Sequence, residues 1–299
     1  MRAQLIHDRS ELSLLDVAAL PVRPEPQRVL MCTPKDFDVV DVKNPHMEGN
    51  IGRVDRTRAQ AQWQELASVF AKLGHEVVTI AGQPGLEDMV FSANQTLPGM
   101  GHDGRPYVVL SHMRHASRRR EVEHYRAWFG ERGYAIRELS ADAGWFEGQG
   151  DAIWHPGKQL LWGGHGPRTS YRAYRELADL LGVPVIELEL VNPSFYHLDT
   201  CFCALSPTAA LVYPAAFDAE SLALLHAMFQ TVIEVEERDA NQFFACNAHC
   251  LDGRWVVLQR GASATVAALR GAGFDPVEVE TSEFLKSGGS VFCLKLMIY

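Results

Sequence analysis

The 299-residue chain is 47% hydrophobic, which is enough for a large buried core, and it carries a formal net charge of −9. This acidic balance argues against a nucleic-acid partner, because phosphate contacts need clustered Lys and Arg, and it suits a cationic small molecule. No apolar run approaches the roughly 20 residues of a membrane span, and residues 1–20 carry charges where a secretion signal is apolar. We therefore expect no membrane partner and a cytoplasmic location. The six cysteines lack a secreted disulfide framework, so free thiols are expected.

The first predicted elements follow an N-terminal extension, residues 1–27, to which the sequence assigns no role. Residues 28–32 are predicted to form a strand, and residues 77–80 a second one. Between them, a helix over 56–73 is expected. It places Trp63, Leu66, Phe70 and Leu73 on one face.

The next segment repeats this order of elements. It starts at Phe91, passes a predicted strand at 107–110 and continues into a helix in which Val122, Tyr125 and Phe129 form a buried stripe. Gly130 and Gly133 are expected to end that helix. The basic run 114–120, which Glu121 and Glu123 follow, is interpreted as the solvated start of the helix.

The same pattern recurs along the rest of the chain. Aromatic residues start each copy at 91, 146, 195, 243 and 292, in steps of 55, 49, 48 and 49 residues. Further helices are expected near 170–181, from 218 and near 263–271. The last copy has room for one strand only, and the N-terminal elements supply the parts that it lacks.

A ring of five ββαβ units, closed by pairing of the N- and C-terminal strands, explains this order. We therefore predict an α/β fold in a single catalytic domain over residues 1–299. The alternative is a mixed α/β protein in which the spacing is coincidental.

In a pseudosymmetric ring, the polar residues that follow each starting aromatic converge on the axis. They are Asn94, Glu147, His197, Asp199, Asn247 and Cys293. Burying a carboxylate or an imidazole costs free energy of hydration unless the group is paired or binds a ligand. This set of residues therefore predicts a functional site.

Four of these residues suggest covalent catalysis on a cationic substrate. Cys293 follows two glycines that allow close approach of the backbone to a ligand. His197 and Asp199 are two residues apart, so on a strand their side chains face the same way, and the carboxylate is expected to help the histidine keep its proton. Glu147, followed by Gly148 and Gly150, is expected to face a planar cation together with Asp199. A small core cysteine and a turn-capping Glu147 are the structural alternatives.

Two other patterns in the sequence suggest different chemistry. Neither Cys246-x-x-x-Cys250 nor Cys201-x-Cys203 has the paired spacing of a structural zinc site, so no metal is predicted. The glycine-rich run 163–170 lacks the Gly-Lys-Ser/Thr ending of a phosphate loop, and its Arg168 is expected to meet a substrate carboxylate.

Several ordered motifs resemble the guanidino-group-modifying enzymes, and most of all the arginine dihydrolases. They are Met31-Cys-Thr-Pro, Asn44-Pro-His-Met-Glu-Gly-Asn, Asp88-Met-Val-Phe-Ser-Ala-Asn94, Phe146-Glu-Gly-Gln-Gly-Asp, Gly166-Pro-Arg-Thr, Phe195-Tyr-His-Leu-Asp-Thr-Cys-Phe-Cys and Glu283-Phe-Leu-Lys-Ser-Gly-Gly-Ser-Val-Phe-Cys. The resemblance runs from about residue 28 to the C-terminus, and it implies a five-bladed α/β propeller.

The resemblance also implies residue roles. Cys293 is the expected nucleophile, His197 the general acid and base, and Glu147 and Asp199 hold the guanidinium. The expected substrate-binding residues are Asn44, Asp88, Asn94, Arg118 and Arg168, the two arginines meeting the α-carboxylate.

Asn94 favours an arginine dihydrolase, since deiminases and dimethylarginine hydrolases usually have Asp there. The expected reaction converts arginine to ornithine, two ammonia and carbon dioxide, without a cofactor. Dimethylarginine dimethylaminohydrolase, arginine deiminase, amidinotransferase and a catalytically silent binding protein stay as alternatives, and a homo-oligomer is left open.

Overall fold

The computed structural model describes residues 4–101 and 103–299. Over these residues the strands form five sheets, and in each an antiparallel pair is followed by a third strand parallel to the second. The strands are β4 (Thr96–Met100), β5 (Pro106–Leu110) and β6 (Ala135–Arg137); β7 (Ala152–Trp154), β8 (Leu161–His165) and β9 (Val185–Glu189); β10 (Phe202–Ser206), β11 (Ala209–Val212) and β12 (Thr231–Glu234); β13 (His249–Cys250), β14 (Trp255–Gln259) and β15 (Asp275–Val279); β16 (Leu296–Ile298), β2 (Arg28–Cys32) and β3 (Glu76–Ile80).

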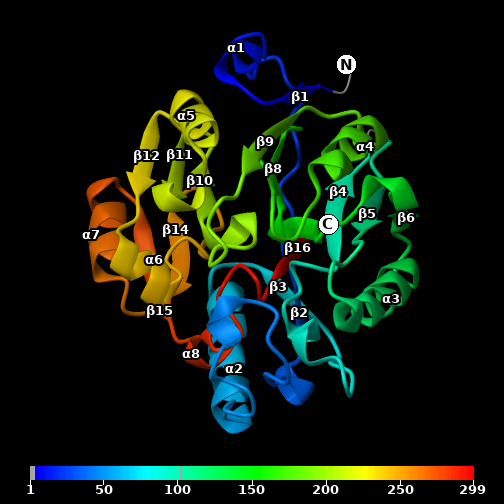
Figure 1. Ribbon diagram of the computed structural model, residues 1–299, viewed down its shortest axis with the longest axis vertical. Helices are drawn as coiled ribbons and strands as arrows, with labels where there is room; N and C mark the ends of the chain where they lie inside the picture. Colours follow the sequence, from blue (N-terminus) through cyan, green and yellow to red (C-terminus); the bar gives the residue numbers. More distant parts are fainter. Residues whose placement is uncertain (1–3, 102) are drawn as a thin grey trace.

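A helix joins the second and third strands of each sheet. These helices are α3 (Ala116–Gly130), α4 (Tyr171–Leu181), α5 (Ala219–Met228), α7 (Ser263–Gly271) and α2 (Arg56–Lys72). They lie towards the rim of the molecule, and the strands lie nearer its middle (Figure 1). The ββαβ order predicted from the repeat is therefore confirmed in all five copies. Shorter helices are α1 (Arg9–Leu12), α6 (Glu237–Phe243) and α8 (Ser282–Leu285).

The predicted helices form where apolar periodicity and capping agree. In α2, Asp55 accepts a hydrogen bond from the backbone N–H of Arg58 at the helix start. The predicted face of α2 is buried at Trp63, Leu66 and Phe70. In α3 the predicted stripe is also buried, and the helix ends at Gly130.

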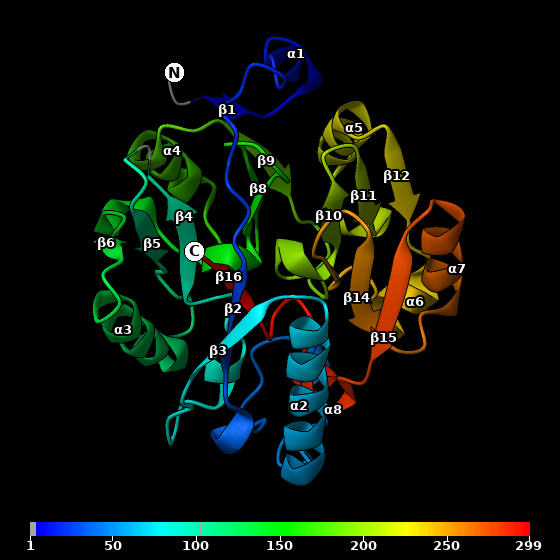
Figure 2. The ribbon, with the colours of Figure 1, turned by 180° about the vertical axis from the view of Figure 1, so that it is seen from behind.

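The two ends of the chain share one sheet. β16 runs antiparallel to β2, with Leu296 opposite Leu30 and Ile298 opposite Arg28. Seen from behind, β16 lies beside β2 near the middle of the molecule (Figure 2). The predicted pairing of the terminal strands is confirmed.

This pairing predicts a large stability effect near the C-terminus. Leu296 is fully buried in the cluster that joins β2, β5 and α3, so Leu296→Ala should lower the free energy of unfolding by about 2–5 kcal/mol in urea denaturation. Leu14, which is 79% exposed, provides the matched control, and Leu14→Ala should change it by less than about 0.5 kcal/mol. Equal effects of the two changes would contradict a cooperative role for the terminal strand pair.

The N-terminal extension adds to another sheet. β1 (Leu5–Ile6) pairs in parallel with β9, which makes that sheet four-stranded. Residues 1–3 of the extension lie outside the described residues.

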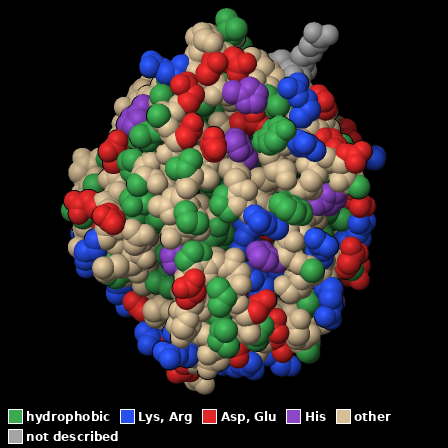
Figure 3. Space-filling model, viewed as in Figure 1, with side chains coloured by type: hydrophobic (Ala, Val, Ile, Leu, Met, Phe, Trp, Pro, Cys, Tyr) green, Lys and Arg blue, Asp and Glu red, His purple; other side chains and the backbone are tan. Residues whose placement is uncertain are grey.

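Along the described ranges, no helix combines the length and apolarity needed to cross a bilayer. Figure 3 shows basic side chains and a histidine side by side near the middle of one face, so the net negative charge does not gather there.

One segment that was expected to be extended is a short 3₁₀ helix instead, at Leu198–Thr200. Gly148–Gly150, which follow Glu147, also form a 3₁₀ helix. The physical reason is that side chains replace the ladder hydrogen bonds, since the backbone N–H of Leu198 donates to Asp151 Oδ1 at 2.9 Å. The expectation that His197 and Asp199 share one face of a strand is therefore wrong.

Candidate active site

Cys293 lies in the loop between α8 and β16, and its side chain is buried. Its thiol donates to Asp199 Oδ2 at 3.1 Å and accepts from Asn247 Nδ2 at 3.2 Å. Burial, followed by the charge of Asp199, raises the pKa of Cys293 well above its usual value. The free protein therefore holds Cys293 as a thiol.

Asn247 fixes the shape of this loop. Its Oδ1 accepts hydrogen bonds from the backbone N–H groups of Ser290 at 3.0 Å and Phe292 at 3.1 Å. The amide group thus holds both the loop and the sulfur atom. Asn247 belonged to the converging set predicted from the repeat, and the structure gives it these contacts.

Glycines allow the surrounding segments to approach closely. A Cβ on Gly289 would lie 2.4 Å from the ring of Phe91, and one on Gly150 would lie 2.3 Å from Asn94 Nδ2. Gly288 has a φ of +80°, which favours glycine. These glycines let protein segments pack closely against one another, and the expected approach of the backbone to a ligand stays a prediction.

His197 is paired with Glu147, not with Asp199. Its Nε2 lies 2.7 Å from Glu147 Oε2, and its Nδ1 lies 3.5 Å from Asn94 Nδ2. Burial lowers the pKa of His197 to about 4, because it outweighs the opposite effect of Glu147. The expectation that Asp199 helps this histidine keep its proton is wrong, because Glu147 is the partner of His197, and burial outweighs the upward effect of Glu147 on the pKa. At neutral pH the neutral ring donates from Nε2 to Glu147 and keeps a lone pair on Nδ1.

Glu147 is fully buried and bound on several sides. It accepts from Arg168 Nη1 at 3.0 Å and from the backbone N–H of Arg114 at 3.1 Å. Burial alone would raise the pKa of Glu147, but Arg168 and then His197 lower it below its usual range. Glu147 is therefore ionised at neutral pH.

Asp199 has an oxygen that is not hydrogen-bonded. Over the described residues, Oδ1 of this fully buried carboxyl group has no donor, whereas Oδ2 accepts from Cys293. Burial raises the pKa of Asp199 to about 7, against the effect of its hydrogen bond with Cys293. A ligand N–H group could satisfy the second oxygen without displacing the thiol.

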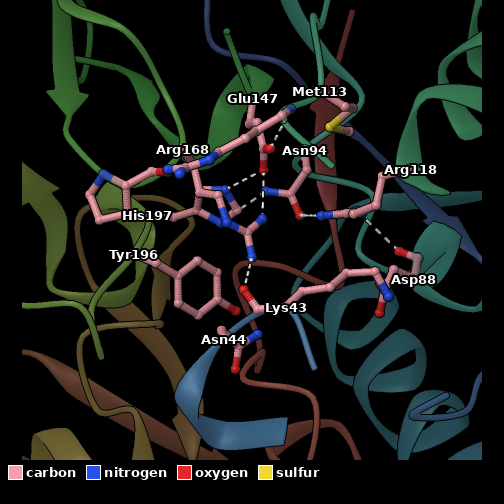
Figure 4. A network of polar contacts seen from close by, with 12 residues as sticks. Lys43, Asn44, Asp88, Asn94, Met113, Arg118, Glu147, Arg168, Tyr196 and His197 are labelled. Carbon is pink, nitrogen blue, oxygen red and sulfur yellow. Dashed lines mark hydrogen bonds and ion pairs between the residues drawn. The ribbon is translucent and has the colours of Figure 1, made fainter. Parts of the chain in front are cut away.

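Part of the site lines a small cavity, and Glu147, His197 and Asp199 are not among the residues that border it. Five of the predicted substrate-binding residues and the predicted nucleophile border it: Asn44, Asp88, Asn94, Arg118, Arg168 and Cys293. Figure 4 shows how His197, Glu147 and Asn94 approach one another beside it. The predicted residues, from distant parts of the sequence, are therefore brought together.

Arg118 differs from its interpretation as part of a solvated helix start. It is 4% exposed and forms an ion pair with Glu121 at 3.0 Å. Its Nη1 also donates to Asn94 Oδ1 at 3.1 Å. That interpretation is wrong at Arg118, because a carboxylate one helical turn away compensates the burial of the guanidinium.

The two arginines expected at a substrate carboxylate already have protein partners. Arg168 binds Glu147 and also donates to the backbone oxygen of Lys43 at 3.1 Å, with its guanidinium 4.6 Å from the ring centre of Tyr196. Both arginines still border the cavity.

Residues that sequence reasoning missed complete the cavity wall. Lys43 forms an ion pair with Asp88 at 3.1 Å, and Tyr196 donates to the backbone oxygen of Gly288 at 2.6 Å. Asn44, which the sequence did predict, donates to the backbone oxygen of Ser287 at 3.0 Å. The sequence could have indicated Lys43 and Tyr196, because each is the immediate neighbour of a predicted site residue.

Comparison with known proteins identifies the class to which this fold and site belong. The sequence model of N,N dimethylarginine dimethylhydrolase, eukaryotic, matches residues 41–299. The chain therefore belongs to the dimethylarginine dimethylaminohydrolase family. This confirms the resemblance to the guanidino-group-modifying enzymes.

Individual relatives support the family assignment. The chain is 39% identical over 274 residues to the bifunctional arginine dihydrolase/ornithine cyclodeaminase AgrE of Nostoc, covering 91% of this chain and 38% of the relative. It is 39% identical to the corresponding protein ArgZ of Synechocystis, covering 91% and 37%. The chain thus spans less than half the length of these two relatives. It is 40% identical over 279 residues to the N(G),N(G)-dimethylarginine dimethylaminohydrolase of Mycobacterium tuberculosis, covering 92% and 87%.

Solved structures show the same fold. The N-terminal domain of ArgZ, as a cysteine-to-serine variant bound to substrate, matches with a TM-score of 0.85 and 38% identity, covering 91% of this chain and 97% of that one. A second structure of that domain is an asparagine-to-serine variant bonded covalently to a reaction intermediate, with the same TM-score.

Proposed function

We propose that the chain hydrolyses the guanidinium group of L-arginine to ornithine, two ammonia and carbon dioxide. The observation that carries this proposal is the hydrogen bond between the Cys293 thiol and Asp199 Oδ2. The other carboxyl oxygen, Oδ1, has no hydrogen-bond donor among the described residues. A guanidinium presents planar N–H donors to such an oxygen and places its carbon beside the sulfur. The similarity to AgrE and ArgZ, which are described as arginine dihydrolases, supports the choice of substrate.

In the first step, the thiol proton passes to neutral His197 and the Cys293 sulfur bonds to the guanidinium carbon. Protonated His197 then gives its proton to a departing nitrogen, and ammonia leaves as the C–N bond breaks. An amidino thioether remains on Cys293. The substrate cation and the nascent thiolate stabilise each other, which compensates the raised pKa of the free thiol.

In the second step, His197 takes a proton from water while the oxygen bonds to the same carbon. The C–S bond breaks, the sulfur recovers its proton, and citrulline is formed. A second round on citrulline expels another ammonia and leaves a carbamoyl thioester, which water converts to a carbamate. The carbamate then falls apart into ornithine and carbon dioxide.

The proposed binding roles combine the cavity wall with two carboxylates that are bound to lining residues. Asp199 and Glu147 would hold the guanidinium, and Asn94 would lie beside the reacting group. Asn44, Asp88, Arg118 and Arg168 would position the amino acid end of the substrate; all four border the cavity.

We further propose that the five sheets form a closed five-bladed α/β propeller within one domain over residues 1–299. The terminal strand pair and the repeated sheet order support this architecture.

A cytoplasmic location is proposed too, and the six free cysteines support it, since a reducing compartment keeps thiols unpaired.

Dimethylarginine hydrolysis is the second candidate, and the family match together with the Mycobacterium tuberculosis relative favours it. Purified protein should be incubated with arginine, methylated arginines, agmatine and citrulline, and ammonia counted per product. Two ammonia per ornithine supports the dihydrolase. Citrulline with one ammonia from arginine would instead indicate a deiminase, and turnover of methylated arginines alone would indicate a dimethylaminohydrolase.

Changing Asn94 to Asp should stop the reaction after one round. A carboxylate at this position, beside His197 and in contact with Arg118, favours the guanidinium cation over neutral citrulline. We expect Asn94→Asp to release about one ammonia per arginine and to accumulate citrulline. The exposed Asn241 of α6 offers a matched control, and Asn241→Asp should keep the ratio of the unmodified protein. An unchanged ratio in Asn94→Asp would refute this role.

A further inference from the structure

A separate cavity of about 340 Å³ lies apart from the one that Cys293 borders, and the two have no lining residue in common over the part of the chain that the structure describes. Its size falls within the usual range of small-molecule sites. Apolar side chains from distant segments form much of its wall, among them Trp154 of β7, Leu205 of β10, Leu251 and Met297 of β16. The cavity is therefore suited to enclose an apolar body.

Lys295 borders this cavity too, and its side chain is fully buried. Its Nζ lies 3.3 Å from Gln149 Oε1 and 3.2 Å from the centre of the Phe292 ring. Over the described residues, Gln149 is the one hydrogen-bond acceptor of this ammonium group, which has three N–H donors. Two donors are therefore left for a ligand. A buried ammonium with one neutral oxygen partner is costly, so packing alone does not account for a lysine here.

His249 supplies a further unpartnered group on the same wall. Its Nε2 is buried and has no hydrogen-bond partner among the described residues. The imidazole lies against the same aromatic ring as Lys295, since the centres of the His249 and Phe292 rings are 5.8 Å apart. Burial lowers the pKa of His249 well below its usual value, so the neutral ring has one N–H to donate. An ammonium and an imidazole N–H beside one ring suit the two oxygens of a carboxylate.

The other charged groups of the wall favour a monoanion over a polyanion. Arg23 borders the cavity, but its guanidinium forms an ion pair with Glu25 at 2.6 Å. Asp252 adds a second carboxylate to the lining. A phosphate or a dicarboxylate would be repelled by Glu25 and Asp252, whereas a single carboxylate needs only the charge of Lys295. One carboxylate on an apolar body thus matches both the donors and the apolar wall.

We propose that this cavity binds a small organic carboxylate, whose oxygens accept hydrogen bonds from Lys295 and His249 and whose apolar body packs against Trp154 and Phe292. The inference does not depend on the proposed function, because Cys293 does not border this cavity and no covalent bond forms or breaks in it. Burial lowers the pKa of Lys295 to about 7, so its side chain is charged below that pH. A bound anion would favour the charged form further.

The test is an NMR titration with 3-phenylpropanoate at about pH 6, where Lys295 is charged. In protein labelled with ¹³C at methionine methyl groups, Met297 reports on this cavity, and Met47 reports on the cavity beside Cys293. Each signal is assigned by its loss in the corresponding Met→Leu variant. The Met297 signal should shift saturably at probe concentrations that leave the Met47 signal unchanged. An unshifted Met297 signal, or a Met47 signal that shifts at the same or lower concentrations, would overturn the inference.

The role of the charge is tested with a neutral probe of the same shape, 3-phenylpropanamide. The amide should bind about tenfold or more weakly than the carboxylate, because it lacks the charge-assisted hydrogen bond. Lys295→Met should weaken binding of the carboxylate by a similar factor and leave binding of the amide unchanged. Lys72→Met, at an exposed position of α2, is the matched control and should change neither. Equal affinities for the two probes in the unmodified protein would refute the assignment to carboxylates.

A second variant fills the cavity without changing Lys295. Ala204 of β10 is a half-buried lining residue, and Ala204→Trp should prevent binding of both probes. Urea denaturation checks the folding of each variant, so the test does not depend on one substitution. Unchanged binding of 3-phenylpropanoate in a folded Ala204→Trp or Lys295→Met protein would place the probe elsewhere and refute the proposed site.

Discussion

Replacing Cys293 with alanine is expected to lower arginine turnover by about 10⁵-fold or more, because the proposed nucleophile of the covalent intermediate is lost. Arginine should still bind, since Asp199 and Glu147 stay in place. Folding should be retained as well, because alanine fits where the thiol was. Steady-state kinetics, calorimetric titration with arginine and urea denaturation measure these three properties separately.

The matched control is a cysteine outside the cavity. Cys250 is half-buried on β13 and does not border the cavity that contains Cys293. Cys250→Ala should keep turnover within about threefold of wild type, as is usual for changes remote from a reacting group. Turnover in Cys293→Ala that resembles turnover in Cys250→Ala would refute a nucleophilic role.

Replacing His197 with glutamine is expected to lower kcat by about 10²–10⁴-fold, the range for a lost general acid and base. Glutamine can keep a hydrogen bond to Glu147, so the loss would reflect proton transfer more than folding. KM should change much less than kcat, because Asp199 and Glu147 hold the guanidinium in the proposed mechanism. The comparison is made by steady-state kinetics at several pH values.

His165, half-buried on β8, is the corresponding control for this change. His165→Gln should have little effect on kcat. If His197→Gln kept nearly full kcat, another group would have to carry the proton. Asp151 would then be examined next, since its Oδ2 lies 4.0 Å from His197 Nε2.

Much of the fold could be predicted because each copy of the repeat shows its strands and helix in the local spacing of apolar residues. Helix α2 shows its buried face directly in the spacing of Trp63, Leu66 and Phe70. The pairing of the chain ends followed from counting elements, since the copy that starts at Phe292 lacked parts that the N-terminus supplied. The converging polar residues followed from the same count.

The detailed geometry could not be predicted because it depends on partners from distant segments. A 3₁₀ turn at Leu198–Thr200 determines that His197 pairs with Glu147 and not with Asp199. The sequence of this segment is typical of a strand and does not predict the turn. The burial of Arg118 depends on its ion pair with Glu121, whereas the sequence alone indicates a solvated helix start at these residues. Burial also reversed the expected pKa shift of His197, an effect that no sequence spacing reveals.

The most direct test of covalent catalysis is acid-quench mass spectrometry of the protein during turnover of arginine. We predict that the peptide containing Cys293 gains the mass of an amidino adduct of arginine after loss of ammonia, and that Cys293→Ser gains none. Turnover of arginine with no adduct on this peptide, or with an adduct on another cysteine, would contradict the account.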